Sequence, residues 1–220
     1  YDDQRERILS QAAELFARQG YVGTSMNEVA AACGVSKAAL YHYVRDKGEL
    51  LLLIAMGHVQ RLDRICQTII AQPLPAPDRL RELILRFVAE YAHASHEHRV
   101  LTEDVKFLSE DDQKAVIQAQ RRVVRAFAGV VLELRPELEK GGLHKALTML
   151  LFGMINWLFT WLRPNGAITH EQIGPMVCDL FFGGLHAVGL PAHPISGQNS
   201  PRSRAQRSGP STTATKTKRT

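Results

Sequence analysis

The sequence predicts an all-α protein with a small N-terminal domain of three helices and a larger helical C-terminal region. Apolar side chains recur at intervals of three and four residues along most of the chain, as they do at Ile8, Ala12 and Leu15. No run alternates convincingly between apolar and polar residues, so no β-sheet is expected. Two short helical segments separated by a glycine turn lie near the N-terminus, and this spacing predicts a compact helical unit.

The N-terminal unit begins with a helix predicted over Gln4–Gln19, which Gly20 ends. Ser25 and Glu28 have the spacing of a capping box, in which each side chain accepts a hydrogen bond from the backbone N–H of the other residue. A second helix is therefore expected from about Met26 to Ala32, where apolar residues recur at helical spacing.

A tight turn and a third short helix are expected next. Gly34 can adopt the left-handed conformation that such a turn requires, and Ser36 is placed to cap a helix from Lys37 to about Tyr43. Two short helices joined in this way form a helix-turn-helix motif. The second helix starts with small side chains and one cation, which would allow its end to enter a DNA major groove.

The rest of the chain is predicted to be helical as well. A fourth helix should run from Asp46 to about Ala71, and a stiff proline-rich connector, Gln72–Pro77, follows it. Lys47 lies in the first turn of the fourth helix, where a cation opposes the helix dipole and should add nothing to stability, so a phosphate partner explains it better. The later helices are expected at about Asp78–His96, near Val100–Leu108, and at Glu110–Leu134, Pro136–Leu162 and about Gln172–Val188.

Residues Thr24–Leu50 resemble the DNA-binding signature of the tetracycline-repressor (TetR/AcrR) family of transcription regulators. Val44 departs from that pattern, because the family usually has phenylalanine at this packing position. The resemblance implies a C-terminal ligand-binding and dimerisation domain, a homodimer, and a double-stranded palindromic DNA operator. The matching positions are Thr24, Ser25, Val29, Ala30, Gly34, Val35, Ser36, Leu40, Tyr41, Tyr43, Lys47 and Leu50.

The resemblance also implies which residues meet DNA. Most of them should hold the phosphate backbone, with some base reading by Lys37 and Tyr41. Tyr21 also falls where the family often touches phosphate, although it could instead be a core aromatic with an exposed hydroxyl. The expected DNA-binding residues are Thr24, Ser25, Ser36, Lys37, Ala38, Ala39, Tyr41, His42, Tyr43 and Lys47.

A dimer interface is expected on the last two helices, as the family resemblance implies. The uncharged stretch Ala146–Leu162 is 17 residues long, at the short limit for a membrane span of about 20 residues. Asn156 is one of several polar residues that lower its hydrophobicity. We therefore predict no membrane partner and a helix that is buried all round, partly by a second copy. The expected interface residues are Leu151, Ile155, Phe181, Phe182 and Leu185; the alternative is that both helices fill the core of a monomer.

An effector site is expected around Asn156, Trp157, Trp161 and Arg163. This N-W-x-x-x-W-x-R-P-N-G run is similar to a branch of the family that senses acyl-coenzyme A thioesters in lipid, steroid or aromatic catabolism. Such a ligand would also involve Phe107 and, at its phosphates, Arg121 and Arg125. Aromatic packing and a solvated helix face are the plainer alternatives.

Charge and cysteine usage limit the other possibilities. The net charge of +5 depends on the stretch from Gly197 to Thr220, which carries six of the 27 basic residues and no acids, so the remaining 21 basic and 22 acidic residues leave a net charge of −1. That stretch should be disordered, either as a passive end or as a source of nonspecific phosphate attraction. Three widely spaced cysteines predict free thiols in a reducing, cytoplasmic setting, and no signal peptide is visible.

No enzyme or metal motif is found. The sequence contains no glycine-rich phosphate loop, G-x-S-x-G, H-E-x-x-H or C-x-x-C pattern. His93, His96 and His98 lack a second pair of ligands with zinc spacing, so neither a metal nor another cofactor is expected.

The function predicted from these patterns is a ligand-responsive repressor. A helical carrier or enzyme that uses an apolar cavity, and an effector-free architectural DNA binder, are the alternatives. The expected domains are residues 1–47 for DNA binding, 48–190 for effector binding and dimerisation with a connecting helix at 48–71, and a basic tail at 191–220.

Overall fold

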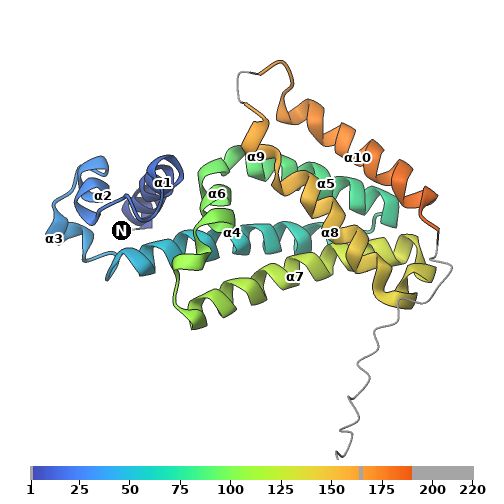
Figure 1. The fold of residues 1–220 in the computed structure, drawn as a ribbon, viewed down its shortest axis with the longest axis horizontal. Helices are drawn as coiled ribbons and strands as arrows, with labels where there is room; N and C mark the ends of the chain where they lie inside the picture. The colour runs from blue at the N-terminus through green and yellow to red at the C-terminus, as the bar shows by residue number, and fades with distance from the viewer. Residues whose placement is uncertain (1, 164–165, 190–220) are drawn as a thin grey trace, which may run out of the picture. The chain divides into compact units, whose positions relative to one another are not determined.

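The computed structural model describes residues 2–163 and 166–189, and every regular element within these ranges is a helix (Figure 1). The predicted all-α class is therefore confirmed for the described residues. The expected tail and two residues of the tryptophan motif, Pro164 and Asn165, lie outside them.

The N-terminal helices are α1 (Asp2–Gln19), α2 (Met26–Ala32) and α3 (Lys37–Leu40). Helix α3 ends three residues earlier than predicted. After Leu40 the N–H groups of His42 and Tyr43 bond to carbonyls three residues back, so the helix gives way to turns. Helix α1 packs on α2 and on helices of the C-terminal region.

Helix α4 (Lys47–Ile70) connects this unit to the rest of the chain, as predicted. Asp46 caps its start, because its Oδ1 accepts a hydrogen bond from Glu49 N at 2.8 Å. The helix packs against α1 and against α5 (Ala76–His93), α6 (Ser95–Glu103) and α7 (Glu110–Leu134). Figure 1 shows α4 and α7 running side by side. A change in the C-terminal helices can therefore reach the N-terminal unit through one continuous element.

Aromatic side chains form much of the C-terminal core. Phe127 on α7 lies edge-on to Phe87 on α5, with ring centroids 4.8 Å apart, and 5.0 Å from Phe152 on α8 (Leu143–Asn156). All three rings are buried. Helix α10 (His170–Ala187) packs on α5 and α8, which completes the layer around this core.

The helix predicted over Pro136–Leu162 is broken into η2 (Pro136–Gly142), α8 and α9 (Leu158–Trp161). Gly141 and Gly142 have φ angles of 78° and 71°, which a continuous right-handed helix cannot contain. Pro136–Trp161 is long and apolar enough to cross a membrane by length and composition, a test that core helices of soluble proteins also pass. However, α8 itself has only 14 residues, fewer than the roughly 20 that a spanning helix needs.

Helix α8 is only partly covered in the single chain. Met149 and Leu150 are 56% and 66% exposed, so the predicted burial of this side by a second copy stays a prediction. The three cysteines are free and buried, as predicted.

Candidate functional site

The helix-turn-helix backbone is held by the capping residues that the sequence predicts. Ser25 Oγ accepts from Glu28 N at 3.2 Å, while Glu28 Oε2 accepts from Ser25 N at 2.7 Å. Ser36 Oγ accepts from Ala39 N at 3.1 Å and so starts α3. Between the two helices, Gly34 adopts a φ of 68°. Local contacts thus determine the angle at which α3 leaves α2.

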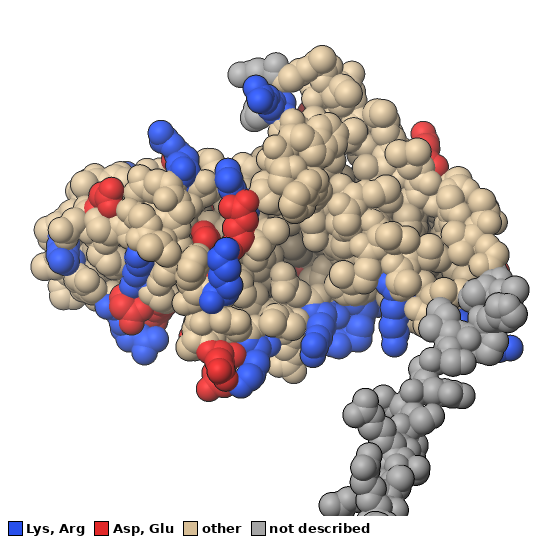
Figure 2. Space-filling view, in the orientation of Figure 1, with Lys and Arg blue, Asp and Glu red and all other residues tan. Residues whose placement is uncertain are grey.

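The outer face of α3 is exposed. Leu40 and Val44 are buried and anchor the segment, so valine fits the position where the family usually has phenylalanine. Figure 2 shows basic side chains at the end of the molecule that carries α3. Of the predicted DNA-binding residues, Ser25, Ser36, Lys37, Ala38, Tyr41 and His42 are exposed, whereas Ala39 and Tyr43 are half-buried.

Lys47 is bound to the loop that precedes α2. Its Nζ donates to the carbonyl oxygens of Tyr21 and Thr24, both at 2.9 Å, and lies 4.4 Å from the centroid of the Tyr21 ring. The expectation that this cation adds nothing to stability is wrong, because it satisfies two partly buried backbone carbonyls. These bonds use two of its three N–H donors, and a phosphate contact through the third stays a prediction.

Thr24 differs from the other predicted DNA contacts. It is only 2% exposed, and its Oγ1 donates to the carbonyl of Gly20 at 2.9 Å and accepts from Gln19 Nε2 at 3.3 Å. A buried hydroxyl with both roles used cannot reach a phosphate. The structure therefore gives this side chain a structural role instead of the predicted DNA contact.

The N-terminal unit meets the C-terminal helices through an aromatic contact. The Tyr21 ring stacks on Phe107 in η1 (Val105–Phe107), with centroids 5.4 Å apart and 19° between the planes. Phe16 lies edge-on to Tyr21, with ring centroids 5.2 Å apart. An open groove of about 610 Å³ beside this stack is lined by Tyr21, Phe107 and Trp157 among others. Phe107, predicted to bind the effector, thus lies at the junction of the two helical units.

A separate, partly enclosed pocket of about 200 Å³ lies among the C-terminal helices. Its apolar wall comes from α4, α7 and α8, with Leu62, Val123 and Phe152 as examples. None of its lining residues in the described chain is a lysine, arginine, aspartate or glutamate. Its polar lining residues are Tyr91, His98, Thr102, Gln120 and Asn156. An apolar cavity with a few polar groups is the usual form of a small-molecule site.

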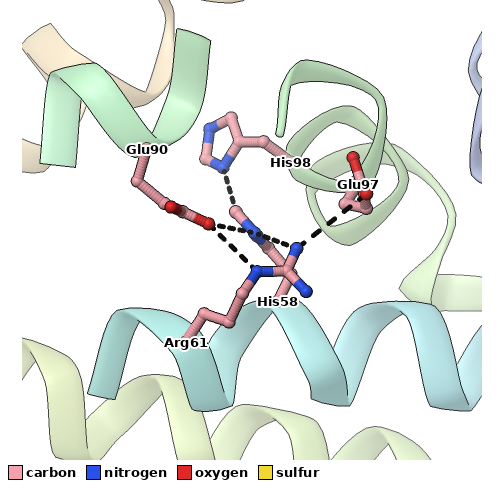
Figure 3. Close-up of polar contacts among 5 residues, drawn as sticks. All are labelled: His58, Arg61, Glu90, Glu97 and His98. Carbon is pink, nitrogen blue, oxygen red and sulfur yellow. Dashed lines mark hydrogen bonds and ion pairs between the residues drawn. The ribbon is translucent and has the colours of Figure 1, made fainter. Parts of the chain in front are cut away.

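Two buried histidines, the pocket-lining His98 and His58, lie in a chain of polar contacts (Figure 3). His58 Nε2 lies 3.3 Å from His98 Nδ1, and Arg61 Nη2 lies 3.4 Å from His58 Nδ1. Arg61 Nε in turn donates to Glu90 Oε1 at 3.0 Å. Burial lowers the pKa of His58 to about 2 and that of His98 to about 4, with the Arg61 charge adding to the shift at His58 and the Asn156 backbone opposing that at His98. Both imidazoles are therefore neutral at physiological pH.

Only part of the predicted effector site lies in the pocket. Asn156 lines it, and its Oδ1 accepts from the Tyr91 hydroxyl at 2.9 Å. Trp157 and Trp161 are 60% and 51% exposed, because the chain leaves the helical path at the end of α8. The remaining predicted residues, Arg121, Arg125 and Arg163, are also exposed.

Sequence reasoning missed the histidine pair. One signal in the sequence could have indicated that both are buried. His58 lies on the apolar stripe of α4, and His98 is followed by apolar residues at helical spacing. The sequence analysis considered His98 only together with the exposed His93 and His96, as a possible metal site, and rejected that site on its ligand spacing. In the described residues, no group of three histidine, cysteine, aspartate or glutamate side chains could hold a metal ion.

The predicted dimer residues are also placed differently. Leu151, Ile155, Phe181 and Leu185 are all less than 7% exposed and pack inside the protomer, and Phe182 is partly buried against the same core. These side chains face inward because α8 and α10 pack on α5, α7 and each other. These five side chains therefore pack in the core of the protomer, and an interface formed by other residues of the same two helices stays a prediction.

Comparisons with known proteins agree with this architecture. The family model described as "Bacterial regulatory proteins, tetR family" matches residues 8–54, and the one described as "Tetracyclin repressor-like, C-terminal domain" matches residues 73–185. Among solved structures, a TetR-family transcriptional regulator from Bordetella parapertussis superposes with a TM-score of 0.79 and 32% identity, covering 87% of this chain and 100% of that one.

Two further relatives are more distant. The transcriptional repressor KstR2 of Mycobacterium tuberculosis is 22% identical over 199 residues, 86% of this chain and 96% of that protein. The structure of AibR in complex with isovaleryl coenzyme A and operator DNA superposes with a TM-score of 0.70 and 24% identity, covering 80% of this chain and 97% of that one.

Proposed function

Because this chain belongs to the tetracycline-repressor family of bacterial transcriptional regulators, we propose that it is a repressor that binds a palindromic operator as a homodimer and is released by a small hydrophobic effector. Residues 1–47 would bind DNA and residues 48–190 would bind the effector and the second copy. The exposed face of α3, on a capped and anchored helix-turn-helix, is the observation that carries this proposal.

The composition of that face supports DNA binding. Lys37 and Tyr41 are exposed beside small side chains at Ser36 and Ala38, so the helix end can approach base edges closely. Backbone contacts would come mainly from hydroxyl groups and cations, and the sequence-reading contacts from Lys37 and Tyr41. Twofold symmetry would place two such faces about 34–36 Å apart, the spacing of neighbouring major grooves on one side of a duplex.

A second copy would cover the exposed apolar face of α8 and α10. Figure 2 shows a broad area over these helices with few charged side chains. Its most exposed apolar residues are Leu150 on α8 and Leu180 on α10, at 66% and 68%. Met149, which precedes Leu150, and Met176, one helical turn before Leu180, are also exposed. A Cβ at Gly153, Gly183 or Gly184 would meet nothing within 4 Å, so another helix can approach closely there. The two helices of each chain would form a four-helix interface.

The effector would occupy the pocket lined by Tyr91, His98 and Asn156. With a volume of about 200 Å³, it can hold an acyl chain or a small ring but not a whole coenzyme A. An acyl-coenzyme A effector, like that bound by AibR, would therefore leave its nucleotide outside. Arg121 and Arg125 are exposed on α7, the helix that contributes Gln120 to the pocket, and would meet its phosphates.

Release would follow from a change at the junction between the two helical units. The pocket residues lie on α4 to α8, and α4 and η1 hold the N-terminal unit through Lys47 and Phe107. An effector can shift DNA binding only by its different affinity for the DNA-competent and released forms. It would favour a form in which the two recognition segments no longer match the half-site spacing.

The direct test is to select bound sequences from random DNA with the full chain and then to compete with candidate metabolites. We expect a palindromic site whose half-sites are one helical turn apart, and its release by a small apolar compound. Lys37→Ala serves as the DNA-contact variant and Lys114→Ala, an exposed lysine on α7, as its control. A chain that ignores every duplex at low salt would contradict the proposal.

A further inference from the structure

One buried ring nitrogen of a pocket-lining residue, His98, makes no hydrogen bond in the described chain, although the Asn156 backbone also acts on this imidazole and opposes the lowering of its pKa by burial. His98 is only 2% exposed, and its Nε2 is buried without a hydrogen-bond partner among the described residues. The ring stacks on Tyr91, with centroids 3.7 Å apart and 20° between the planes, so it cannot turn away freely. A buried polar atom left unpaired costs about 1–3 kcal/mol, which a correctly placed ligand group would recover.

The chain of contacts behind His98 determines whether that atom is a donor or an acceptor. Arg61 can only donate hydrogen bonds, so His58 Nδ1, 3.4 Å from Arg61 Nη2, must accept. Glu90 Oε1 lies 3.8 Å from the same nitrogen, beyond hydrogen-bond range, and is already paired with Arg61 Nε. The neutral His58 therefore carries its proton on Nε2 and donates it to His98 Nδ1, 3.3 Å away.

The same reasoning then applies to His98. Because its Nδ1 accepts a proton from His58, a neutral His98 carries its own proton on Nε2. A second proton on Nδ1 would face the N–H of His58, so this arrangement holds His98 neutral. Figure 3 shows the other ring nitrogen of His98 on the side away from His58. The N–H donor at Nε2 thus belongs to a residue that lines the pocket.

The rest of the lining limits the charge of the group that accepts this bond. The other polar residues of the pocket are Tyr91, Thr102, Gln120 and Asn156, all uncharged at neutral pH. A carboxylate buried against them would lose its hydration without gaining a cation. A hydroxyl would accept the bond but would bring a proton that needs an acceptor of its own, whereas a carbonyl oxygen needs only donors.

We propose that this pocket recognises an uncharged carbonyl compound, or the uncharged acyl end of a larger one, whose carbonyl oxygen accepts a hydrogen bond from His98 Nε2. This inference rests on the proposed function, since it specifies the effector of the same site. The apolar walls would hold the chain or ring that bears the carbonyl group. A thioester and a ketone share this chemistry, and the test below separates them.

The first experiment measures affinity by calorimetry with matched probes on the unaltered chain. Butanoyl-, octanoyl- and phenylacetyl-coenzyme A are each compared with the S-alkyl analogue that lacks only the carbonyl oxygen. Cyclohexyl methyl ketone is compared with cyclohexanecarboxylate. We expect at least one carbonyl probe to bind about tenfold more tightly than its partner without the carbonyl oxygen or with a negative charge. A preference confined to the coenzyme A pairs identifies a thioester, and one confined to the free ketone identifies a ketone.

The second experiment uses His98→Phe, which keeps an aromatic ring on Tyr91 but removes both nitrogens. The affinity difference within the best pair should disappear in this variant and persist in His96→Phe, an exposed position on the same helix. Equal affinities within every pair, tighter binding of the carboxylate, a difference that survives His98→Phe, or no binding by any probe would each overturn the proposal. Operator binding, measured in parallel, is independent of these outcomes and tests the regulator function separately.

The third experiment requires no ligand and no variant. The nitrogen NMR shifts of the histidine side chains report which ring atom carries the proton. We expect His98 and His58 both to be protonated at Nε2 and unprotonated at Nδ1 in the free chain. A proton on Nδ1 of His98 would make Nε2 an acceptor and would overturn the inference even if carbonyl compounds bind.

Discussion

Lys47 and Tyr21 are 26 positions apart in the sequence, yet the Lys47 ammonium donates to the Tyr21 carbonyl at 2.9 Å and also lies 4.4 Å from the centroid of its ring. The contact joins the start of α4 to the loop before α2. Since Tyr21 also stacks on Phe107, the same loop is held from the connecting helix and from η1. The position of the helix-turn-helix therefore depends on a few non-local contacts.

We expect Lys47→Met to destabilise the folded chain by roughly 2 kcal/mol. The variant keeps the aliphatic stem but removes charge-assisted hydrogen bonds to two partly buried carbonyls, those of Tyr21 and Thr24. Urea unfolding followed by circular dichroism would measure the change. The same variant should also weaken binding to every DNA sequence if the third N–H meets a phosphate, and unchanged stability would contradict the role assigned to these bonds.

Lys37→Ala should show the opposite pattern. Lys37 is exposed, and no hydrogen bond within the described chain depends on its side chain, so the melting temperature should stay within about 1 °C of the parent. Its loss should weaken operator binding and reduce the slope of log affinity against log salt by about 1 for a phosphate contact. Fluorescence anisotropy across a salt series measures both. Lys114→Ala, on α7, should leave the slope unaltered.

Leu180→Glu should convert the proposed dimer to a monomer. Leu180 is 68% exposed in the single chain, so the charge costs little in the monomer but must be buried if α10 packs against a second copy. Light scattering after size-exclusion chromatography gives the mass directly. Ile117→Glu, at a 40% exposed position on α7, is the matched control and should remain dimeric. A Leu180→Glu variant that is still a dimer would place the interface elsewhere.

Two glycines should respond oppositely to alanine. Gly34 has a φ of 68°, so Gly34→Ala should destabilise the helix-turn-helix by about 1 kcal/mol although the Cβ would meet no atom within 4 Å. Gly129 lies inside α7 with equally open space, and Gly129→Ala should stabilise the chain by about 0.5–1 kcal/mol. Thermal unfolding distinguishes the two signs. A stabilising Gly34→Ala change would show that the turn is not left-handed.

The buried histidine pair predicts that stability falls in mild acid. In the unfolded chain both imidazoles take up a proton near pH 6.5, whereas burial lowers the pKa of His58 to about 2 and of His98 to about 4 in the folded chain. Between about pH 4 and 6.5 the unfolded state therefore binds more protons than the folded state. Each histidine then lowers the free energy of unfolding by up to about 1.4 kcal/mol for each pH unit by which the pH falls.

The measurement compares melting temperatures at pH 7 and pH 5. His98→Gln should lose less stability over this range than the parent chain, because one of the two buried sites no longer takes up a proton on unfolding. His96→Gln, at an exposed position on α6, should behave as the parent does. An equal loss in the parent and in His98→Gln would show that His98 already binds its proton in the folded state.

Local sequence by itself determined the helical class, most helix starts and the helix-turn-helix. Ser25 and Ser36 act on backbone N–H groups three residues away, so their capping roles follow from spacing alone. In the structure, Asp46 and Ser109 cap α4 and α7 with the same spacing. Gly34 likewise marks its turn without reference to any distant residue. For the same reason the exposed residues that begin α3 could be identified before the fold was known.

Only the tertiary structure decided which side chains are buried and which contacts cross the chain. Leu151 and Phe181 face inward although Leu150 and Leu180 beside them are exposed, because packing against α5 and α7 selects one face of an all-round apolar helix. His58 and His98 are 40 positions apart in the sequence and lie on different helices, yet their rings are in contact. Lys47 likewise bonds to a loop that precedes it by more than 20 residues. Periodicity describes the faces of single helices. The pocket lined by His98 and the junction of the two helical units instead arise between helices whose mutual placement depends on the whole core.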